Sequence, residues 1–319
     1  MTPQSRRSFL KNTALSTTSL AWFASRPASA AGPAGKARSS LRLGGPAFAK
    51  INDPESLALA HRKLGYRAAY CPSVSLKETA RIREFETAFA KHDVVIAEVG
   101  RWVNLMDSDP EKRKKNLESV TEGLALADEI GALCCVDIAG SFNPQSWFGP
   151  HPENMSRKFM EAAVENARSI IDAVKPKRAK FCYEMMGWAP PDTADSYLKL
   201  IKSIDRKSFG VHLDPCNAVN SPEKFYRNTD LLNECFDKLG KWIVSCHAKD
   251  LAWEIEMNIH FKEVIPGKGS LDYGTYLRRL AELPHSPPLM LEHLSTPEEY
   301  AAGAEYIRAT GLKAGLSFE

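Results

Sequence analysis

The chain has 319 residues, of which 44% are hydrophobic and 25% are charged, an ordinary globular composition with enough residues for a large core. Its net charge of +3 depends on residues 1–30, which hold four of the 42 basic residues and no acidic one, so that 38 basic residues face 39 acidic ones in the remainder. That balance disfavours a nucleic-acid partner, and no segment after residue 30 is long and apolar enough to span a bilayer.

The first thirty residues have the features of a twin-arginine export signal. The segment Ser5–Lys11 contains paired arginines, a modestly apolar run follows from Thr13 to Phe23, and Ala28–Ala30 offers a small-residue cleavage site. A membrane anchor is disfavoured because the apolar run is short and rich in Ser and Thr. We therefore expect residues 1–30 to be a cleaved signal and residues 31–40 a linker. The mature protein is expected in the periplasm or cell envelope, with no membrane span.

Strand-like and helix-like segments then alternate from residue 41 to the end of the sequence. The clearest helix is Pro110–Ile130, where apolar residues recur with a helical period. The expected strands cover Leu41–Gly44, Tyr66–Cys71, Val94–Val99, Leu133–Ile138, Phe181–Glu184, Phe209–Asp214, Val244–Asp250 and Leu289–Glu292. The expected helices cover Glu55–Leu64, Leu76–Lys91, Pro110–Ile130, Met155–Val174, Ala194–Ile204, Thr229–Leu239, Tyr273–Leu283 and Pro297–Ala309.

This alternation predicts the fold class. Continuous apolar strands separated by helices indicate a parallel sheet that is covered by helices. Eight such units in about 280 residues predict a closed (β/α)8 TIM barrel, formed as a single domain by residues 41–319. An open doubly wound sheet is the alternative, but no glycine-rich phosphate loop follows the first strand.

The seven cysteines lie mostly in apolar, strand-like segments, with no CxxC pair and no regular spacing. We expect mainly buried thiols, and the sequence does not call for disulfides, although it leaves them open.

Three expected strands end in a carboxylate, and a fourth carries a histidine near its end. The carboxylates are Glu184, Asp214 and Glu292, and the histidine is His247. In a (β/α)8 barrel the strand ends meet at one mouth, where active sites form. Taken alone, His247 is more simply explained as a hydrogen-bonded core histidine. Three carboxylates and one imidazole at the ends of four strands, however, predict a metal site with oxygen and nitrogen ligands.

Five motifs follow one another between residues 181 and 294. They are YEMM from Tyr183, HLDPCN from His212, CHAKD from Cys246, PGKGSLDY from Pro266 and LEHL from Leu291. With these motifs at barrel spacing, the chain resembles the xylose-isomerase-like barrel proteins, the sugar phosphate isomerase/epimerase group that also contains endonuclease IV. The resemblance covers essentially the whole mature chain.

The resemblance implies one bound divalent ion, with Mn²⁺ favoured over Mg²⁺, Co²⁺ or Zn²⁺, held by Glu184, Asp214, His247 and Glu292. It implies a sugar isomerase or epimerase in which Glu184 and Glu292 act as base and acid on either side of a small carbohydrate. The ion would polarise the sugar carbonyl and stabilise the enediolate that proton abstraction leaves. A homodimer or homotetramer is the assembly that the family suggests.

One position departs from the family pattern. Sugar epimerases and endonuclease IV commonly carry a histidine three residues after the aspartate of the sixth strand, where this chain has Asn217. Asparagine can bond a sugar hydroxyl but is a poor zinc ligand. His212, on the same strand face as Asp214, is either a partial replacement or a core histidine. Endonuclease IV assembles three zinc ions from many histidines and this chain has eight histidines in all, so a DNA-repair role is not expected.

Four further residues are candidates for substrate contact, each with a structural alternative. Lys249 lies one step nearer the mouth than the histidine and either holds a sugar oxygen or is solvated. Glu98 ends the third strand and either contacts substrate or pairs with a nearby arginine. Trp147 and Trp188 lie in long loops and either stack on a sugar or close a lid.

Two other functions stay open. Relatives act on 3-keto-glycosides, from which a proton beside the ketone is removed and the β-substituent expelled, so a metal-dependent lyase or hydratase is the first alternative. Export favours it, because free glycosides are more plausible than sugar phosphates outside the cytoplasm, and no glycine-rich phosphate cradle is present. An exported sugar-binding protein without catalysis is the second. Two opposed carboxylates argue against it, since binding alone does not require them.

Overall fold

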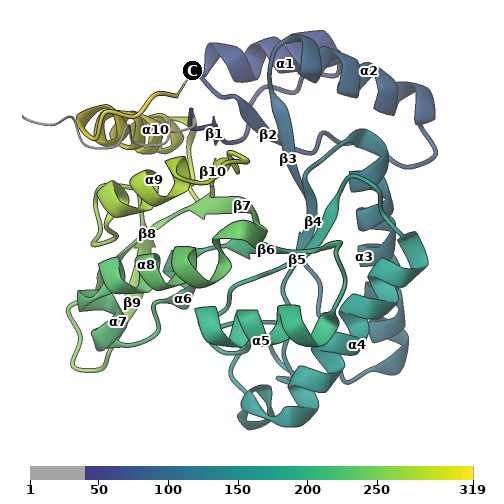
Figure 1. Cartoon of the computed structure of the whole chain (residues 1–319), viewed down its shortest axis with the longest axis vertical. Coiled ribbons are helices and arrows are strands. Elements are labelled where there is room, and N and C mark those ends of the chain that lie inside the picture. The colour runs from purple at the N-terminus through teal and green to yellow at the C-terminus, as the bar shows by residue number, and fades with distance from the viewer. Residues whose placement is uncertain (1–39, 319) are drawn as a thin grey trace, which may run out of the picture. The chain divides into compact units, whose positions relative to one another are not determined.

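The computed structural model of the protein describes residues 40–318, and within them eight parallel strands form a closed barrel (Figure 1). Around the barrel the strands follow the order β1-β10-β7-β6-β5-β4-β3-β2. The predicted (β/α)8 fold is confirmed. The predicted export signal and all but the last residue of the predicted linker lie outside the described residues.

The strands of the barrel are short, and all of them are largely buried. They are β1 (Leu43–Gly44), β2 (Ala68–Tyr70), β3 (Val95–Gly100), β4 (Cys134–Asp137), β5 (Lys180–Glu184), β6 (Phe209–Leu213), β7 (Ile243–Ala248) and β10 (Leu289–Leu291). A separate antiparallel hairpin follows β7 and consists of β8 (Asp250–Trp253) and β9 (Phe261–Val264).

Helices connect the strands and cover the outside of the barrel. The long ones are α1 (Pro54–Lys63), α2 (Thr79–Lys91), α3 (Pro110–Ile130), α4 (Arg157–Val174), α5 (Ala194–Ile204), α8 (Asn228–Leu239), α9 (Tyr273–Ala281) and α10 (Pro297–Lys313). Shorter segments are η1 (Pro152–Met155), α6 (Pro215–Ala218), α7 (Pro222–Tyr226) and η2 (Gly240–Trp242).

Helix α3 shows how local sequence sets an element. The carboxylate of Asp109 accepts from backbone N–H groups of the first turn, and Pro110 occupies the first helical position, where no N–H is needed. Gly131 ends the helix with φ +78°, a left-handed conformation that costs glycine little. The apolar residues with the predicted period are buried against the barrel: Val120, Leu124, Ala127 and Ile130.

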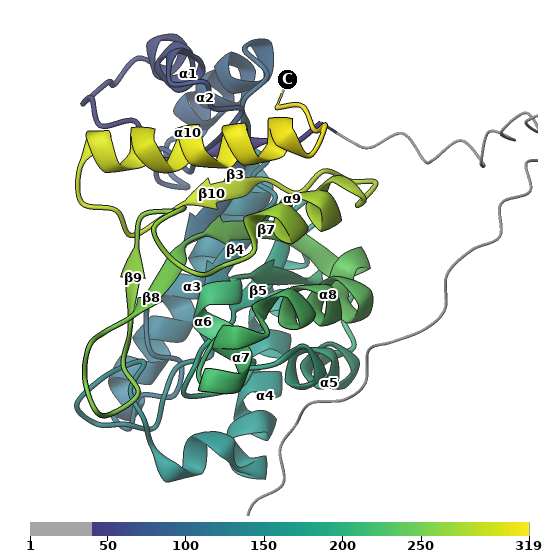
Figure 2. The ribbon, with the colours of Figure 1, turned by 90° about the vertical axis from the view of Figure 1, so that its left-hand side faces the viewer.

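The barrel closes where its first and last strands meet. Gly44 of β1 pairs with Met290 of β10 and with Ala68 of β2. A Cβ atom on Gly44 would lie 2.5 Å from the Met290 sulfur and from the Ala68 carbonyl oxygen, so a larger residue would force these strands apart. Figure 2 shows α10 beside α1 at this seam, where Arg308 donates to the Leu64 carbonyl at 2.9 Å.

The β8–β9 hairpin was not predicted. The sequence predicts one strand over Val244–Asp250, whereas β7 ends at Ala248 and Asp250 begins β8. Its base is held by Asp250, whose carboxylate accepts from the backbone N–H groups of Leu251, Gly267, Gly269 and Leu271 at 2.9–3.0 Å. On the outer side, Phe261 of β9 stacks on Phe225 of α7 with ring centroids 4.9 Å apart. Asp250 is therefore a structural clamp at the edge of the barrel mouth.

Helix α10 is longer than predicted. It was expected to end at Ala309 and continues to Lys313, through a buried glycine at position 311. The ring of Phe318 packs against the space where a side chain of Gly311 would be. Packing at this position thus outweighs the low helix propensity of glycine.

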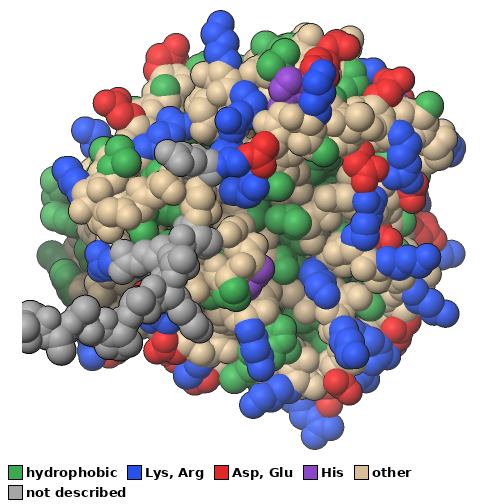
Figure 3. All heavy atoms as spheres, turned by 45° about the horizontal axis from the view of Figure 1, so that its top comes forward, with side chains coloured by type: hydrophobic (Ala, Val, Ile, Leu, Met, Phe, Trp, Pro, Cys, Tyr) green, Lys and Arg blue, Asp and Glu red, His purple; other side chains and the backbone are tan. Residues whose placement is uncertain are grey.

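The surface and the thiols agree with an ordinary globular barrel. On the face shown in Figure 3, basic and acidic side chains are interspersed. Within residues 40–318, no helix combines the length and the apolar character that crossing a membrane requires.

All seven cysteines are free thiols. Six are buried and Cys71 is partly exposed, so the prediction of mainly buried thiols is confirmed.

Acid stability should depend on His61 of α1. Its ring is 5% exposed and packs on Phe89 of α2, and burial lowers the pKa of His61 from 6.5 to about 4. The unfolded chain therefore takes up a proton at a higher pH than the folded chain, and stability present above pH 6.5 is lost as the pH falls toward 4. From about pH 7 to about pH 5 this site should lower the free energy of unfolding by about 2 kcal/mol.

Urea unfolding of wild type and His61→Leu at the two pH values measures this contribution. The variant should lose less stability on acidification by that amount. Equal acid sensitivity of wild type and His61→Leu would contradict the assignment.

Candidate metal centre and its cleft

Four residues from neighbouring strands converge at one mouth of the barrel. Glu184 ends β5, Asp214 follows β6, His247 lies in β7 and Glu292 follows β10. One potential ligand atom of each lies within 4.8 Å of those of the others. His247 Nδ1 is 2.7 Å from Glu184 Oε1 and 3.0 Å from Glu292 Oε2. The structure thus brings together the four residues that the sequence suggested as ligands.

The parallel register explains this convergence. Glu184 lies level with His212 of β6, and His247 lies level with Met290 of β10. Asp214 comes two residues after His212, and Glu292 comes two residues after Met290. Side chains two apart in an extended segment share a face, so both carboxylates point into the barrel mouth.

Two buried carboxylate oxygens in this group have cationic neighbours but no well-aligned hydrogen bond. Asp214 begins helix α6 and its Oδ1 accepts from the N–H of Asn217 at 3.1 Å, whereas its Oδ2 faces Lys249 and His247. Glu292 Oε2 faces the same two side chains. Buried carboxylate oxygens are costly unless a cation lies beside them. Three carboxylates and one imidazole at these distances fit a divalent cation that takes mixed oxygen and nitrogen ligands.

Lys249 supplies one positive charge to the same oxygens. Its Nζ lies 2.9 Å from both Asp214 Oδ2 and Glu292 Oε2, at ion-pair distance. The Oδ1 of Asn217 accepts from this ammonium at 3.2 Å. Only 2% of the Lys249 side chain is exposed, so the alternative of a solvated lysine is wrong. Lys249 and Asn217 together form part of the polar floor of the mouth.

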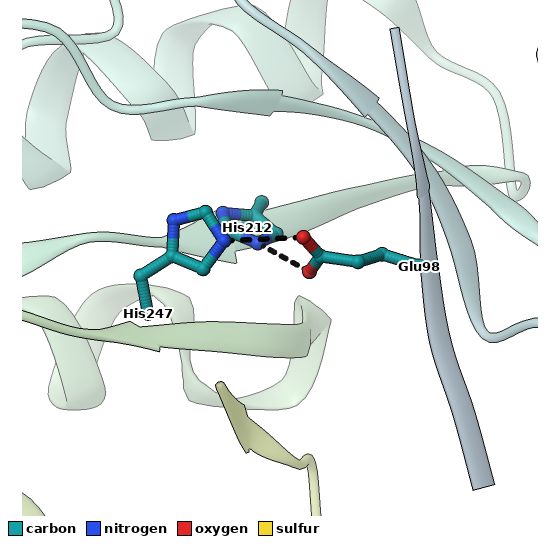
Figure 4. A group of neighbouring side chains, drawn as sticks. All are labelled: Glu98, His212 and His247. Carbon is teal, nitrogen blue, oxygen red and sulfur yellow. Dashed lines mark hydrogen bonds and ion pairs between the residues drawn. The ribbon is translucent and has the colours of Figure 1, made fainter. Parts of the chain in front are cut away.

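The carboxylate of Glu98 points toward the rings of both His247 and His212, as the dashed lines in Figure 4 show. Its Oε1 is 3.1 Å from His247 Nε2, and its Oε2 is 2.8 Å from His212 Nε2. The Ser245 hydroxyl also donates to Oε2, at 2.9 Å. With its Nε2 proton directed at Glu98, His247 holds a second proton on Nδ1, beside Glu184 and Glu292, and a bound metal ion would take the place of that proton. Such a carboxylate–histidine pair orients a metal-binding imidazole.

This geometry shows the contacts of His212 and Glu98. His212 is fully buried and bonded to Glu98, as expected of a core histidine, and together with Glu98 and His247 it forms a second group whose potential ligand atoms lie within 4.8 Å of one another. Glu98 was expected to contact substrate or to pair with Arg101. Its described partners are the two histidines and Ser245, while Arg101 donates to backbone carbonyls of Ser119 and Gly100.

Burial and neighbouring charges move the pKa values of the two glutamates in opposite directions. Burial raises the pKa of Glu184, and the charges of His247 and Lys249 only partly oppose it. Burial also acts on Glu292, but there the same two cations and a hydrogen bond from His247 outweigh it and lower the pKa to about 2. Glu292 is therefore the more readily ionised of the pair. Two carboxylates with separated pKa values are typical of an acid and a base.

A cavity of about 620 Å³ opens above the cluster. Glu184, Lys249, Asn217 and Glu292 line its inner end. We call it the aromatic cavity, because its walls include the rings of Trp102, Trp147, Phe148, Trp188 and Phe261. The two tryptophans proposed from the sequence, Trp147 and Trp188, thus lie at the same cavity as the cluster.

Three residues of the site were not singled out from the sequence. Ser245 lies two residues before His247 and so shares its inward face, a signal that the sequence did contain. Trp102 lies just beyond β3 and lines the cavity. Glu263 is on the unpredicted hairpin, and its Oε2 is 2.8 Å from His293 Nδ1. No local sequence pattern predicts that the hairpin lies beside the barrel mouth.

Comparison with known proteins defines the class. The sequence model of the Xylose isomerase-like TIM barrel family matches residues 60–310, and the chain belongs to this family. Over 213 residues it is 25% identical to the probable endonuclease 4 of Persephonella marina, an alignment that covers 60% of this chain and 70% of that protein.

Solved structures share the fold at low sequence identity. A xylose isomerase-like TIM barrel protein from Mycobacterium smegmatis, in complex with magnesium, has a TM-score of 0.60 at 19% identity, over 86% of this chain and 98% of that one. D-psicose 3-epimerase from Clostridium cellulolyticum, with D-tagatose, has 0.59 at 15%, over 85% and 99%. The 3-keto-D-glucoside 4-epimerase of E. coli has 0.58 at 14%, over 85% and 99%.

The support of His247 by Glu98 can be tested through metal affinity. Glu98→Gln removes the charge that orients the imidazole and should weaken Mn²⁺ binding about 10- to 100-fold. Isothermal titration of the metal-stripped protein with Mn²⁺ measures the change. Asp137→Asn is a matched control, because Asp137 is an equally buried acid whose carboxylate bonds only backbone N–H groups. Unchanged affinity in a folded Glu98→Gln protein, or an equal loss in the control, would contradict the role.

Proposed function

We propose that the protein is a divalent-metal-dependent sugar isomerase or epimerase that removes a proton beside a carbonyl group. The observation that carries this is the cluster of Glu184, Asp214, His247 and Glu292, with ligand atoms within 4.8 Å, at the floor of a cavity of about 620 Å³. That volume is in the range of small-molecule sites. The likeness to two sugar epimerases and to a magnesium complex supports the same chemistry, with Mn²⁺ as the proposed ion.

A divalent cation held by these four residues would polarise the sugar carbonyl and stabilise the negative charge of an enediolate. Glu184 and Glu292 come from β5 and β10, which β6 and β7 separate around the barrel, and in this proposal the two carboxylates would approach the substrate from different sides. Glu292, the more readily ionised, would take the proton from carbon, and Glu184 would return one to the other face. Return to the same carbon gives an epimer, and return to the neighbouring carbon converts aldose and ketose.

Lys249 and Asn217 have supporting roles in this proposal. The ammonium of Lys249 lies 2.9 Å from two of the carboxylates and lines the cavity, so it can donate to a sugar oxygen beside them. Asn217 lines the same floor and can bond a hydroxyl. Both would orient the sugar, so that the carbon to be deprotonated faces Glu292.

The endonuclease relative raises DNA as another substrate, and the histidines argue against it. All eight histidines of the chain lie in the described residues; His247 belongs to the carboxylate cluster and also to a second possible ligand group with Glu98 and His212, and His260 belongs to a partly exposed third group with Glu254 and Glu256. His212 is engaged by Glu98, and His293 by Glu263. With Asn217 beside Asp214, the mouth offers few nitrogen ligands for several zinc ions.

The charges at the cavity favour an uncharged sugar over a sugar phosphate. Lys249 is paired with Asp214 and Glu292, and Lys262 lies 3.0 Å from Glu254. Among the described residues that line the aromatic cavity, these are the two lysines, and no arginine joins them. A phosphate group would thus meet cations that already have partners.

Two other functions are alternatives to the proposed isomerase or epimerase: a lyase and a sugar-binding protein. The likeness to a 3-keto-D-glucoside 4-epimerase favours keto-glycosides as substrates, and enolisation of such a compound followed by loss of a β-substituent would make the enzyme a lyase. A sugar-binding protein without turnover would keep the cavity but not need separated pKa values in two opposed carboxylates. Export through the twin-arginine pathway is proposed from the sequence of residues 1–30 alone.

Deuterium exchange tests the reaction. The Mn²⁺-loaded protein, incubated in D₂O with a panel of ketoses and 3-keto-glycosides, should place deuterium on a carbon beside the carbonyl, followed by NMR. Because Glu292 would take the proton, Glu292→Gln should slow this exchange by at least about 100-fold. An epimer, an isomer or a released aglycone then identifies the product class.

Glu254→Gln is the control, since Glu254 lies on the exposed hairpin and pairs with Lys262 outside the cluster. Exchange should persist there. Absence of exchange over the whole panel, with Mn²⁺ bound, would refute the proposed reaction for these sugars and favour the binding protein.

A further inference from the structure

A second cavity adjoins the aromatic cavity. It has a volume of about 610 Å³ and extends past Tyr70 and Ser73 toward the ends of β2 and β3; we call it the side cavity. The two cavities share three lining residues, Trp102, Glu292 and His293. One of the two proposed acid–base residues therefore lies where the cavities meet, and open space continues on both sides of it.

Trp102 stands at this junction. Its ring is 6.4 Å from the ring of His247, and 40% of the residue is exposed. The ring packs over Gly100, where a Cβ atom would lie 2.8 Å from the indole Nε1, so the bare glycine lets the indole lie against the end of β3. An indole face held in this way beside the carboxylates suits the apolar face of a sugar ring.

The outer wall of the aromatic cavity carries more apolar surface than one sugar ring needs. Trp147, Phe148 and Trp188 are 37%, 49% and 59% exposed, yet they line a cavity instead of the core. Trp147, Phe148 and Trp188 line the aromatic cavity alone, whereas Trp102 lines both cavities. A sugar seated at Trp102 and Glu292 would leave these rings uncovered.

We propose that the substrate is a glycoside that spans the cleft. Its carbonyl-bearing sugar lies at the junction over Trp102, and a second ring, an aryl aglycone or another sugar, stacks on Trp147 and Trp188. The seat of the first sugar rests on the proposed function, whereas the second-ring subsite rests on the aromatic wall. Each cavity by itself is as large as a typical site for a drug-sized ligand, which a single hexose does not fill.

Ring selectivity tests the subsite without any reaction. Methyl β-D-glucoside, phenyl β-D-glucoside and methyl β-cellobioside have blocked anomeric centres and no carbonyl group, so their binding to the Mn²⁺-loaded protein involves no proton transfer. The phenyl glucoside, the methyl cellobioside or both should bind roughly five- to tenfold more tightly than the methyl glucoside, as measured by calorimetric titration. Whichever of the two gains affinity identifies the second ring as aryl or sugar.

The variants locate the gain. Trp188→Ala and Trp147→Ala should remove the preference for the second ring and leave methyl glucoside binding unchanged. Trp253→Ala is the matched control, because Trp253 is 58% exposed, like Trp188, but lies on the hairpin outside both cavities. Equal affinity for all three ligands, or a loss in the control equal to that in Trp188→Ala, overturns the subsite.

The two proposals fail separately. Deuterium exchange that persists without ring selectivity would overturn the second-ring subsite and leave the reaction. Ring selectivity without deuterium exchange on any keto sugar would support the subsite and overturn the reaction.

Discussion

Three largely buried carboxylates lie within 4.8 Å of one another at the barrel mouth, and nearby positive charge must offset their mutual repulsion. Two like charges about 4 Å apart repel by about 4 kcal/mol at the effective dielectric of a protein site. Glu184, Asp214 and Glu292 stay together because His247 and Lys249 lie among them at 2.7–3.0 Å. Three carboxylates nevertheless face two cationic side chains, so the cluster can accept the further positive charge that a divalent ion would bring.

The residues that form and support the cluster lie at two heights along the barrel axis. The upper level is the row of strand ends at β5, β6, β7 and β10, where the parallel register sets each carboxylate. The lower level comes from β3 on the other side of the barrel, whose Glu98 reaches across to His247 and His212. A carboxylate buried this deeply is stabilised by the two imidazoles, whose charges lower the pKa of Glu98 although burial alone would raise it. The same contact fixes the ring that faces the cluster.

The strand-end residues of the site could be predicted from the sequence, and the contacts that could not be predicted have physical causes. The strand-end acids and His247 could be placed because apolar runs mark the strands and a barrel brings their ends together. The partner of Glu98 could not be inferred, since a contact across the barrel joins residues 149 positions apart and has no local signal. The hairpin was missed for a related reason: Asp250 organises it through backbone N–H groups of Gly267 and Gly269, which the sequence shows only as a turn.

Strand ends carry the residues of the proposed reaction, and loops carry the aromatic residues proposed to contact the substrate. The cluster sits on strand ends, where the barrel hydrogen bonds hold it rigidly, whereas Trp147 and Trp188 lie in connections that can differ without disturbing those bonds. A relative named as a probable endonuclease and proteins named as sugar epimerases share this barrel, as expected if function depends on what the loops add around a common site. In this chain the connections add exposed aromatic faces, whereas the two lysines of the aromatic cavity, beside β7 and in β9, are paired with carboxylates. Under the proposed function, that combination suits a neutral, ring-containing substrate better than a polyanion, because stacking needs uncovered rings and phosphate needs uncommitted cations.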